Sequence, residues 1–157
     1  MVSEVLFSSK TEVWSTPRDF YEALDKVFHF TTDVAALPEN AKCTHYFTPE
    51  MDGLKQDWVG SCFCNPPYGK TIGQWIEKAY RESKKGATVV CLVPARVDTR
   101  WWQDYCLNAE VWFVRGRLKF GNAESCAPFP SALVCFRPQL ADAFTKNQSG
   151  LFESTEY

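Results

Sequence analysis

Two apolar runs on either side of an amphipathic segment constrain the fold more than any other feature of the chain. GSCFCN (60–65) is a short strand stopped by two prolines, and ATVVCLVPAR (87–96) is continuously apolar, as in a parallel strand buried on both faces. Between them, TIGQWIEKAYRESKKG (71–86) repeats its apolar residues at helical spacing. The centre of the chain therefore predicts a strand, a helix and a parallel strand.

Further elements extend this unit on both sides. Helices are predicted within 15–30, with Thr16 as N-cap and Pro17 at the first helical position, and within 100–108, capped by Asp98 or Thr99. Strands are predicted within 28–36, 109–120 and 130–138, and the segment 41–59 reads as mostly loop with a binding role and a possible short strand at 45–48. This order predicts a doubly wound, mostly parallel α/β sheet, with room for an antiparallel strand near the end.

Composition limits the classes of protein to which the chain can belong. Its 157 residues suit a single domain, here 1–138, followed by a polar C-terminal tail over 139–157. A formal net charge of −2 gives no strongly basic coat, so contacts with nucleic acid would depend on a local patch. No stretch is long and apolar enough to cross a membrane, and we expect a soluble, cytoplasmic protein with no membrane partner.

The seven cysteines do not predict a disulfide framework. The number is odd, and most cysteines lie in apolar runs, where cysteine behaves as a small hydrophobic residue in a reducing compartment. Cys43 and His45, together with Cys62 and Cys64, form the one arrangement that resembles a zinc site. Their spacing within each pair is shorter than is usual for structural zinc, so we expect no metal.

The turn NPPY, residues 65–68, follows the first central strand. Proline forces Asn65 into an extended conformation, and Pro66 and Pro67 fix their own φ angles, so the turn is stiff before any ligand arrives. The Asn65 side-chain oxygen and the Pro66 carbonyl could each accept a hydrogen from an amino group on a flat ring, and Tyr68 could stack on that ring. Two such acceptors localise the nitrogen lone pair for attack on the methyl group of a sulfonium donor.

Several segments together resemble the phage DNA N6-adenine methyltransferase (Dam) family, which uses S-adenosyl-L-methionine. They are WSTPRDFYEAL, DVAALPENAKCTHYFT, DGLKQDWVGSCFCNPPYG, LVPARVDTRWW, GRLKFG and PFPSALVCF, and they span about residues 12 to 138. The resemblance implies a Rossmann-like methyltransferase domain and methyl transfer to the N6 amine of a flipped adenine in double-stranded DNA. It also suggests a phage enzyme of the restriction-modification type, which marks DNA against host restriction.

The same resemblance implies roles for individual residues. Asn65, Pro66, Pro67 and Tyr68 match the catalytic turn. Thr16, Pro17 and Asp33 match cofactor contacts, and Ala35 is small enough to let the backbone approach the cofactor. Phe120 matches the aromatic residue on the other face of the base, and the candidate contacts to phosphate or bases are Arg96, Arg100, Arg115 and Arg117.

One departure from the wider pattern is the missing FxGxG loop, in whose place stands TTDVAA. No separate target-recognition domain is visible, so specificity would rest on a short DNA sequence. Two alternatives remain open at this point. The same chemistry could act on RNA or on a protein glutamine, since the turn grips an amine, and the chain could be a non-catalytic DNA-binding decoy with the same fold.

Overall fold

The strand, helix and strand at the centre of the chain form as the sequence predicts. The computed structural model of the protein describes residues 14–138. Strand β3 (Ser61–Cys64) leads through the turn to helix α3 (Ile72–Lys84) and then to strand β4 (Thr88–Pro94). β3 and β4 pair in parallel, with Cys62 opposite Val89. The polar tail expected over 139–157 lies outside the described residues.

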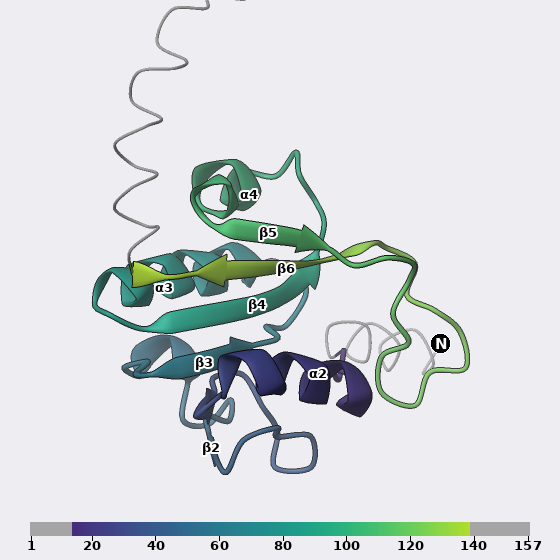
Figure 1. Cartoon of the computed structure of the whole chain (residues 1–157), viewed down its shortest axis with the longest axis horizontal. Coiled ribbons are helices and arrows are strands. Elements are labelled where there is room, and N and C mark those ends of the chain that lie inside the picture. The colour runs from purple at the N-terminus through teal and green to yellow at the C-terminus, as the bar shows by residue number, and fades with distance from the viewer. Residues whose placement is uncertain (1–13, 139–157) are drawn as a thin grey trace, which may run out of the picture.

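Six strands form one mostly parallel sheet (Figure 1). The other four are β1 (Thr32–Asp33), β2 (His45–Tyr46), β5 (Glu110–Phe113) and β6 (Ser131–Phe136). The order across the sheet is β2-β1-β3-β4-β6-β5, and β6 alone runs antiparallel to its neighbours β4 and β5. The expectations of a mostly parallel sheet and of an antiparallel strand near the end are confirmed.

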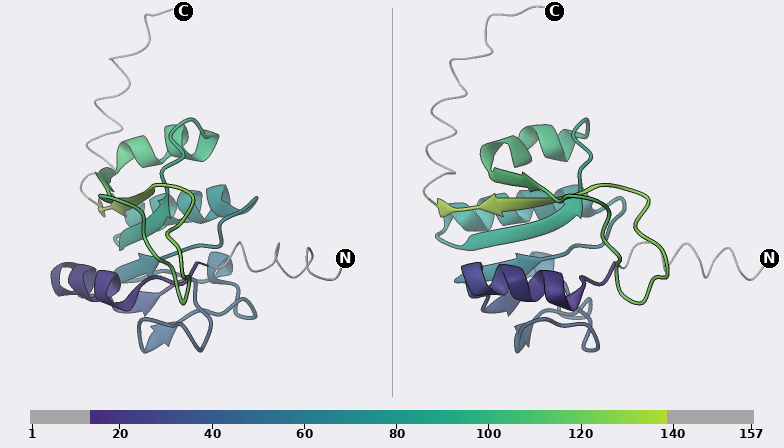
Figure 2. Two further views of the ribbon diagram at one scale, coloured as in Figure 1. Left: turned by 90° about the vertical axis from the view of Figure 1, so that its right-hand side faces the viewer. Right: turned by 45° about the vertical axis from the view of Figure 1, so that its right-hand side comes forward.

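Helices lie on both faces of this sheet. α2 (Arg18–Phe28) lies on one face and α3 on the opposite face, while the short helix α4 (Arg100–Asp104) precedes β5 (Figures 1 and 2). Two 3-10 turns complete the described elements, η1 (Gly53–Lys55) and η2 (Cys106–Asn108). The chain therefore forms a mixed α/β domain.

The ends of two helices test the predicted caps. Thr99 caps α4, because its hydroxyl oxygen accepts a hydrogen bond from the Trp102 amide at 3.3 Å. The prediction that Thr16 caps α2 is wrong, since the helix begins at Arg18 with Pro17 at the N-cap and no side-chain cap. The Thr16 hydroxyl instead accepts a hydrogen bond from the side chain of Asn65.

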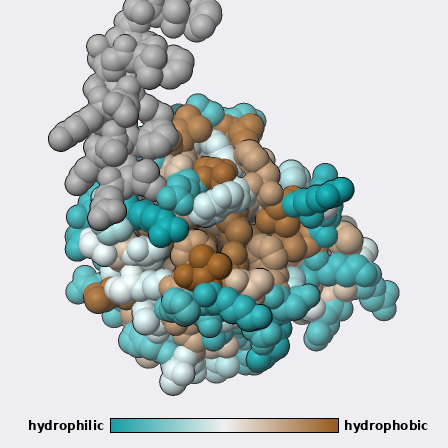
Figure 3. Space-filling model, viewed as in Figure 1, coloured by the Kyte–Doolittle hydropathy of each residue, from teal (hydrophilic) through white to brown (hydrophobic). Residues whose placement is uncertain are grey.

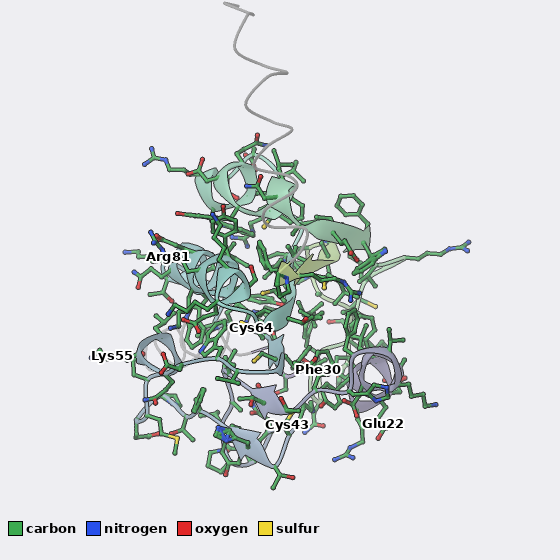
Figure 4. All side chains as sticks on the ribbon, turned by 60° about the vertical axis from the view of Figure 1, so that its left-hand side comes forward. Glu22, Phe30, Cys43, Lys55, Cys64 and Arg81 are labelled. Atoms are coloured by element: carbon green, nitrogen blue, oxygen red, sulfur yellow. The ribbon has the colours of Figure 1, made fainter. Side chains whose placement is uncertain are left out.

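The core is built on the two longest strands. Every residue of β6 is buried, and so is every residue of β4 after Thr88, because helices and neighbouring strands cover them. Figure 4 shows Cys64 inside the molecule, whereas Arg81 of α3 and Lys55 of η1 lie at its periphery. Figure 3 shows apolar residues gathered near the middle of the face seen in Figure 1, within a mainly polar rim.

A buried carboxylate fastens the loop before β3 to helix α3. Glu82 is 2% exposed, and its Oε2 accepts a hydrogen bond from the backbone amide of Trp58 at 3.1 Å. Its Oε1 pairs with the ammonium groups of Lys78 at 2.8 Å and Lys85 at 2.9 Å. Because every partner satisfies part of a charge that is out of water, this cluster holds the loop in one position.

Replacing Glu82 should therefore cost much more stability than replacing an exposed glutamate of the same helix. We expect Glu82→Ala to lower the free energy of unfolding by about 2–4 kcal/mol, because the Trp58 amide and Lys78 lose their partner in a buried place. The matched control Glu77→Ala removes an exposed pair with Arg81 and a hydrogen bond with the largely exposed Tyr105 hydroxyl, and should cost less than about 1 kcal/mol. Urea denaturation measures both, and equal losses would contradict the argument.

Candidate active site

The carboxyl ends of the parallel strands meet at one edge of the sheet, and the chain places polar residues there. Asp33 ends β1, and Asn65 directly follows β3. The left panel of Figure 2 looks onto this edge, which the loop between β5 and β6, residues 114–130, crosses. Ligands of open α/β sheets bind beyond the carboxyl ends of the strands. The edge is therefore the place to look for a site.

A cavity of about 310 Å³ lies at this edge. It falls in the size range of small-molecule sites, which hold about 300–1,000 Å³. Six of the predicted site residues line it, namely Thr16, Asp33, Ala35, Asn65, Pro66 and Pro67. Much of the remaining wall comes from the segment 40–54, and the binding role expected for the loop 41–59 stays a prediction.

Asn65 has its amide group held in one orientation. Its Nδ2 donates hydrogen bonds to the backbone carbonyl of Trp14 and, at 2.9 Å, to the hydroxyl oxygen of Thr16. A carbonyl oxygen can only accept, so the nitrogen must face Trp14 and the Oδ1 must face away. Within residues 14–138 that Oδ1 is buried and has no hydrogen-bond partner. A buried acceptor without a partner costs free energy, which a ligand with an N–H donor would recover.

Asp33 and Lys42 bring opposite charges to the cavity wall. Asp33 is 3% exposed, and its carboxylate accepts hydrogen bonds from the backbone amides of Lys42 at 3.0 Å and Ala35 at 3.4 Å. Burial raises the pKa of the Asp33 carboxyl group, although both hydrogen bonds act in the opposite direction. Burial lowers the pKa of the Lys42 ammonium group. A ligand that carries both an ammonium and a carboxylate group fits such a wall.

Gly53 allows a close contact between the loop before β3 and the end of β1. A Cβ atom at this position would lie 2.3 Å from the Val34 carbonyl oxygen and 3.0 Å from the ring of Trp75. Only glycine fits without a shift of the backbone. The Gly53 carbonyl also accepts a hydrogen bond from the indole of Trp58 at 2.8 Å. Gly53, in the loop before β3, thus contacts Val34 directly after β1, and residues of both segments line the cavity.

Tyr68 and Phe120 come together, but outside the lining of the cavity. Tyr68 is 5% exposed and donates its hydroxyl hydrogen to the Leu92 carbonyl at 2.9 Å, and burial raises the pKa of its phenol. Phe120 is 3% exposed and meets the Tyr68 ring edge-on, with planes at 84°. In this arrangement no flat ring lies between the two side chains, and their stacking on a base stays a prediction.

The four predicted arginines are exposed around the same edge. Arg96 and Arg100 follow β4, and Arg115 and Arg117 follow β5 in the loop that crosses the edge. Arg117 reaches the Ala127 carbonyl at 3.5 Å, which ties the two sides of this loop. None of the four lines the cavity, so their contacts with nucleic acid also stay predictions.

Cys43, Cys62 and Cys64, the cysteines of the arrangement that resembles a zinc site, have structural roles. Cys62 and Cys64 are buried in β3, and the Cys43 thiol is 3.3 Å from the hydroxyl of Tyr21. In the part of the chain that the structure describes, no three histidine, cysteine or acidic side chains gather closely enough to hold a metal ion. Of the helices within residues 14–138, none has both the length and the apolar character that crossing a membrane requires.

Comparison with known proteins decides the family. Residues 4–146 match the family described as DNA N-6-adenine-methyltransferase (Dam). The chain belongs to this family. It is also 29% identical, over 101 residues, to the DNA N-6-adenine-methyltransferase of Escherichia phage T1, a match that covers 62% of this chain and 42% of the phage protein. The chain therefore matches less than half of that relative's own length.

A second relative comes from a bacterium. The chain is 35% identical over 63 residues to a protein of Escherichia coli (strain K12) named "Putative methyltransferase YfdM". This match covers 35% of the chain and 69% of the bacterial protein. The family match also extends beyond both ends of the resemblance seen in the sequence, which spans about residues 12 to 138.

Sequence reasoning missed several residues of the site. Trp14, Asn40, Lys42, Asp52 and Trp75 line the cavity without having been predicted. For Asn40, Lys42 and Asp52 a signal existed, because they follow β1 and β2, whose carboxyl ends reach the same edge. Trp75 looked like an ordinary core residue of α3, and Trp14 precedes the first helix without any periodic pattern. Neither had a signal of its own.

The Thr16 hydroxyl should matter because it holds the amide of Asn65. Thr16→Val keeps the shape of the side chain but removes the acceptor, which leaves one buried N–H of Asn65 unpaired. We expect a loss of about 1–3 kcal/mol in the free energy of unfolding. Thr16→Ser retains the hydroxyl and should lose less than half as much. Denaturant titration of both variants measures the difference, and equal losses would show that the methyl group matters instead.

Proposed function

We propose that the protein transfers a methyl group from S-adenosyl-L-methionine to the exocyclic N6 amine of adenine in double-stranded DNA. We further propose that its sheet is a doubly wound, Rossmann-like methyltransferase fold. One observation carries the proposal most: the Asn65 amide is fixed, and its buried Oδ1 at the edge of the cavity has no hydrogen-bond partner within residues 14–138. Family membership and the printed name of the phage T1 relative support the choice of DNA adenine.

The residues of the cavity suit the cofactor. Asp33 would face its α-ammonium group and Lys42 its carboxylate, while Phe47, Leu54 and Trp75 offer apolar surface for the rest. S-adenosylmethionine supplies an electrophilic methyl group on a sulfonium. Gly53, in close contact with Val34 and Trp75, forms part of the cavity wall that would hold the cofactor.

Asn65 and Pro66 would act on the base. Asn65 Oδ1 accepts one N6 hydrogen and the Pro66 carbonyl accepts the other, which localises the nitrogen lone pair toward the methyl carbon. The new N–C bond would form as the C–S bond of the donor breaks with its electron pair left on sulfur, and the extra N6 proton would leave to water. The stiff turn keeps both acceptors in place before the base arrives, so little reorganisation is needed in the transition state.

A base inside a duplex cannot reach this edge. The adenine must leave the helix, at a cost of a few kcal/mol that contacts in the site must recover. The exposed arginines that follow β4 and β5 would then contact phosphates beside the flipped nucleotide. This placement is consistent with a chain of formal net charge −2, because the positive charge would be local.

Methyl transfer should depend on Asn65 far more than cofactor binding does. With labelled S-adenosylmethionine and unmethylated DNA, we expect Asn65→Ala to lower the rate by at least about 100-fold, as does loss of an oriented polar group that stabilises a transition state. Calorimetric affinity for S-adenosylhomocysteine should change by less than about tenfold. The matched control Asn108→Ala lies outside the cavity and should retain the wild-type rate.

The same assay separates the alternatives. Parallel samples contain RNA and a glutamine-containing protein, and nucleoside mass analysis with methylation-sensitive nucleases identifies the modified base and its position. Transfer to RNA or protein alone would replace the proposal with the corresponding alternative. No transfer to any substrate, together with tight DNA binding and no cofactor binding, would identify a decoy.

As the pH is lowered, cofactor affinity should begin to fall at a higher pH than it would if Asp33 had the ordinary pKa of an aspartate. Burial raises the folded-state pKa of Asp33, so its carboxylate takes up a proton earlier as the pH falls, and the protonated form loses its attraction for an ammonium group. We expect binding of S-adenosylhomocysteine to be strongest above this pKa and to weaken through it. Asp33→Asn should bind about tenfold more weakly at neutral pH and lose this pH dependence.

Calorimetry from about pH 8 to about pH 5 measures the effect. Asp104→Asn is the matched control, because Asp104 is exposed at the end of α4 and should leave the pH profile unchanged. If Asp33→Asn had the same pH profile as the wild-type protein, the proposal that Asp33 contacts the cofactor would be wrong.

A further inference from the structure

Four aromatic rings close the edge of the sheet above the NPPY turn. Trp14, Tyr68, Phe120 and Phe129 are in contact in all six pairings, with ring centroids between 5.1 and 6.5 Å apart. They come from three places in the chain: the segment before α2, the turn after β3 and the loop 114–130. We call these four side chains the aromatic cluster.

Within the aromatic cluster, Trp14 is the ring that faces Tyr68. Their planes are inclined by only 23°, a stacked arrangement, whereas Phe120 and Phe129 meet Tyr68 at 84° and 70°. Tyr68 is 5% exposed, so little of its ring is free for another partner. A base that stacks on Tyr68 therefore needs space that the indole now fills. An indole and a purine are both flat, fused five- and six-membered ring systems of nine ring atoms, which makes the indole a close substitute in shape.

The backbone around Trp14 is held by hydrogen bonds, whereas its side chain is held by packing. The Trp14 carbonyl accepts a hydrogen bond from Asn65, and the next carbonyl, that of Ser15, accepts one from the Gly121 amide at 2.7 Å. The Trp14 side chain itself bonds to nothing in the described chain through its indole nitrogen, and the residue is only partly buried. Because Asn65 is bonded to the backbone carbonyl of Trp14, a rotation about the Trp14 side-chain torsions would leave that hydrogen bond in place.

From this arrangement we propose that Trp14 is a plug in the base site: its indole occupies the place of the target base and leaves the Tyr68 ring when the base enters. The inference rests on the proposed function, because it assigns an occupant to the same site. The plug makes the base compete with a side chain of the protein. The apparent affinity for the base then equals the intrinsic affinity of the open site multiplied by the fraction of molecules in which the site is open.

The first test observes the ring directly and needs no turnover. The protein is labelled with 5-fluorotryptophan, and the Trp14 fluorine signal is assigned by its loss in Trp14→Phe. With the cofactor site filled by S-adenosylhomocysteine, a single-stranded deoxyadenosine dodecamer is added, which presents bases that need no flipping. We expect a saturable shift of the Trp14 signal, and no comparable shift with a thymidine dodecamer, which has the same phosphates but no exocyclic amine.

The Trp112 signal serves as the internal control, because Trp112 lies on β5 and is 44% exposed. A Trp14 signal that stays in place while the deoxyadenosine strand binds, as judged by fluorescence anisotropy of a labelled strand, would overturn the plug. So would complete absence of binding by the strand at millimolar concentration.

The second test uses kinetics on sheared, unmethylated DNA. We expect Trp14→Ala to lower KM for DNA about tenfold, with Trp14→Phe in between and Trp112→Phe unchanged. A higher KM for DNA in Trp14→Ala would show that Trp14 contributes to binding the base. An unchanged KM would show that Trp14 does not affect binding of the base. Either result overturns the plug. If Trp14→Ala fails to fold, Trp14→Phe and the fluorine signal still decide.

The two proposals fail in different ways. Absence of methyl transfer by the wild-type protein would refute the proposed function, while the fluorine experiment would still report whether a purine displaces the indole. Transfer by the wild type with no movement of Trp14 would refute the plug alone.

Discussion

The hydrogen bonds from the Asn65 amide nitrogen hold together the parts of the molecule that make the site. They join the turn after β3 to the segment 14–16, which comes from the other end of the described chain. The same segment is bonded to the loop 114–130 through Ser15 and to the loop after β1 through Asn40. The Asn65 side chain thus fixes the orientation of its own oxygen, and the hydrogen bonds of the segment 14–16 connect it to the loops around the cavity. Because proline residues follow it, Asn65 has little backbone freedom with which to adapt.

Much of the fold could be predicted because its elements carry strong periodic signals. The apolar runs of β3, β4 and β6 and the stripe of α3 each indicate one structure, and the order of elements indicates a mostly parallel sheet. Shorter elements were less predictable. β1 has only two residues, although a strand was expected within 28–36, because α2 continues to Phe28 and the chain bends after Asp33, whose carboxylate accepts hydrogen bonds from the amides of Ala35 and Lys42. Such side-chain bonds leave no periodic trace in a sequence.

The site was predictable where a motif stands in one continuous stretch and less so where the wall is assembled from separate segments. Asn65, Pro66 and Pro67 were found from the turn itself, and the structure puts them at the cavity. Gly53 shows the opposite case. Its lack of a side chain is needed only because the Val34 carbonyl, nineteen residues away, lies where a Cβ would be. The need for glycine at this position could therefore not be predicted from the sequence around it.

The antiparallel direction of β6 determines where the chain can vary. Because β6 runs against β5, the connection between them starts and ends at the same edge of the sheet, next to the NPPY turn. Such a hairpin connection can lengthen or change composition without moving any strand, and each doubling of its length adds only about 0.6 kcal/mol of closure entropy. Within the described chain, residues 114–130 are thus the part that evolution could rewrite at least cost to the sheet. This loop could therefore diversify while the NPPY turn stays intact.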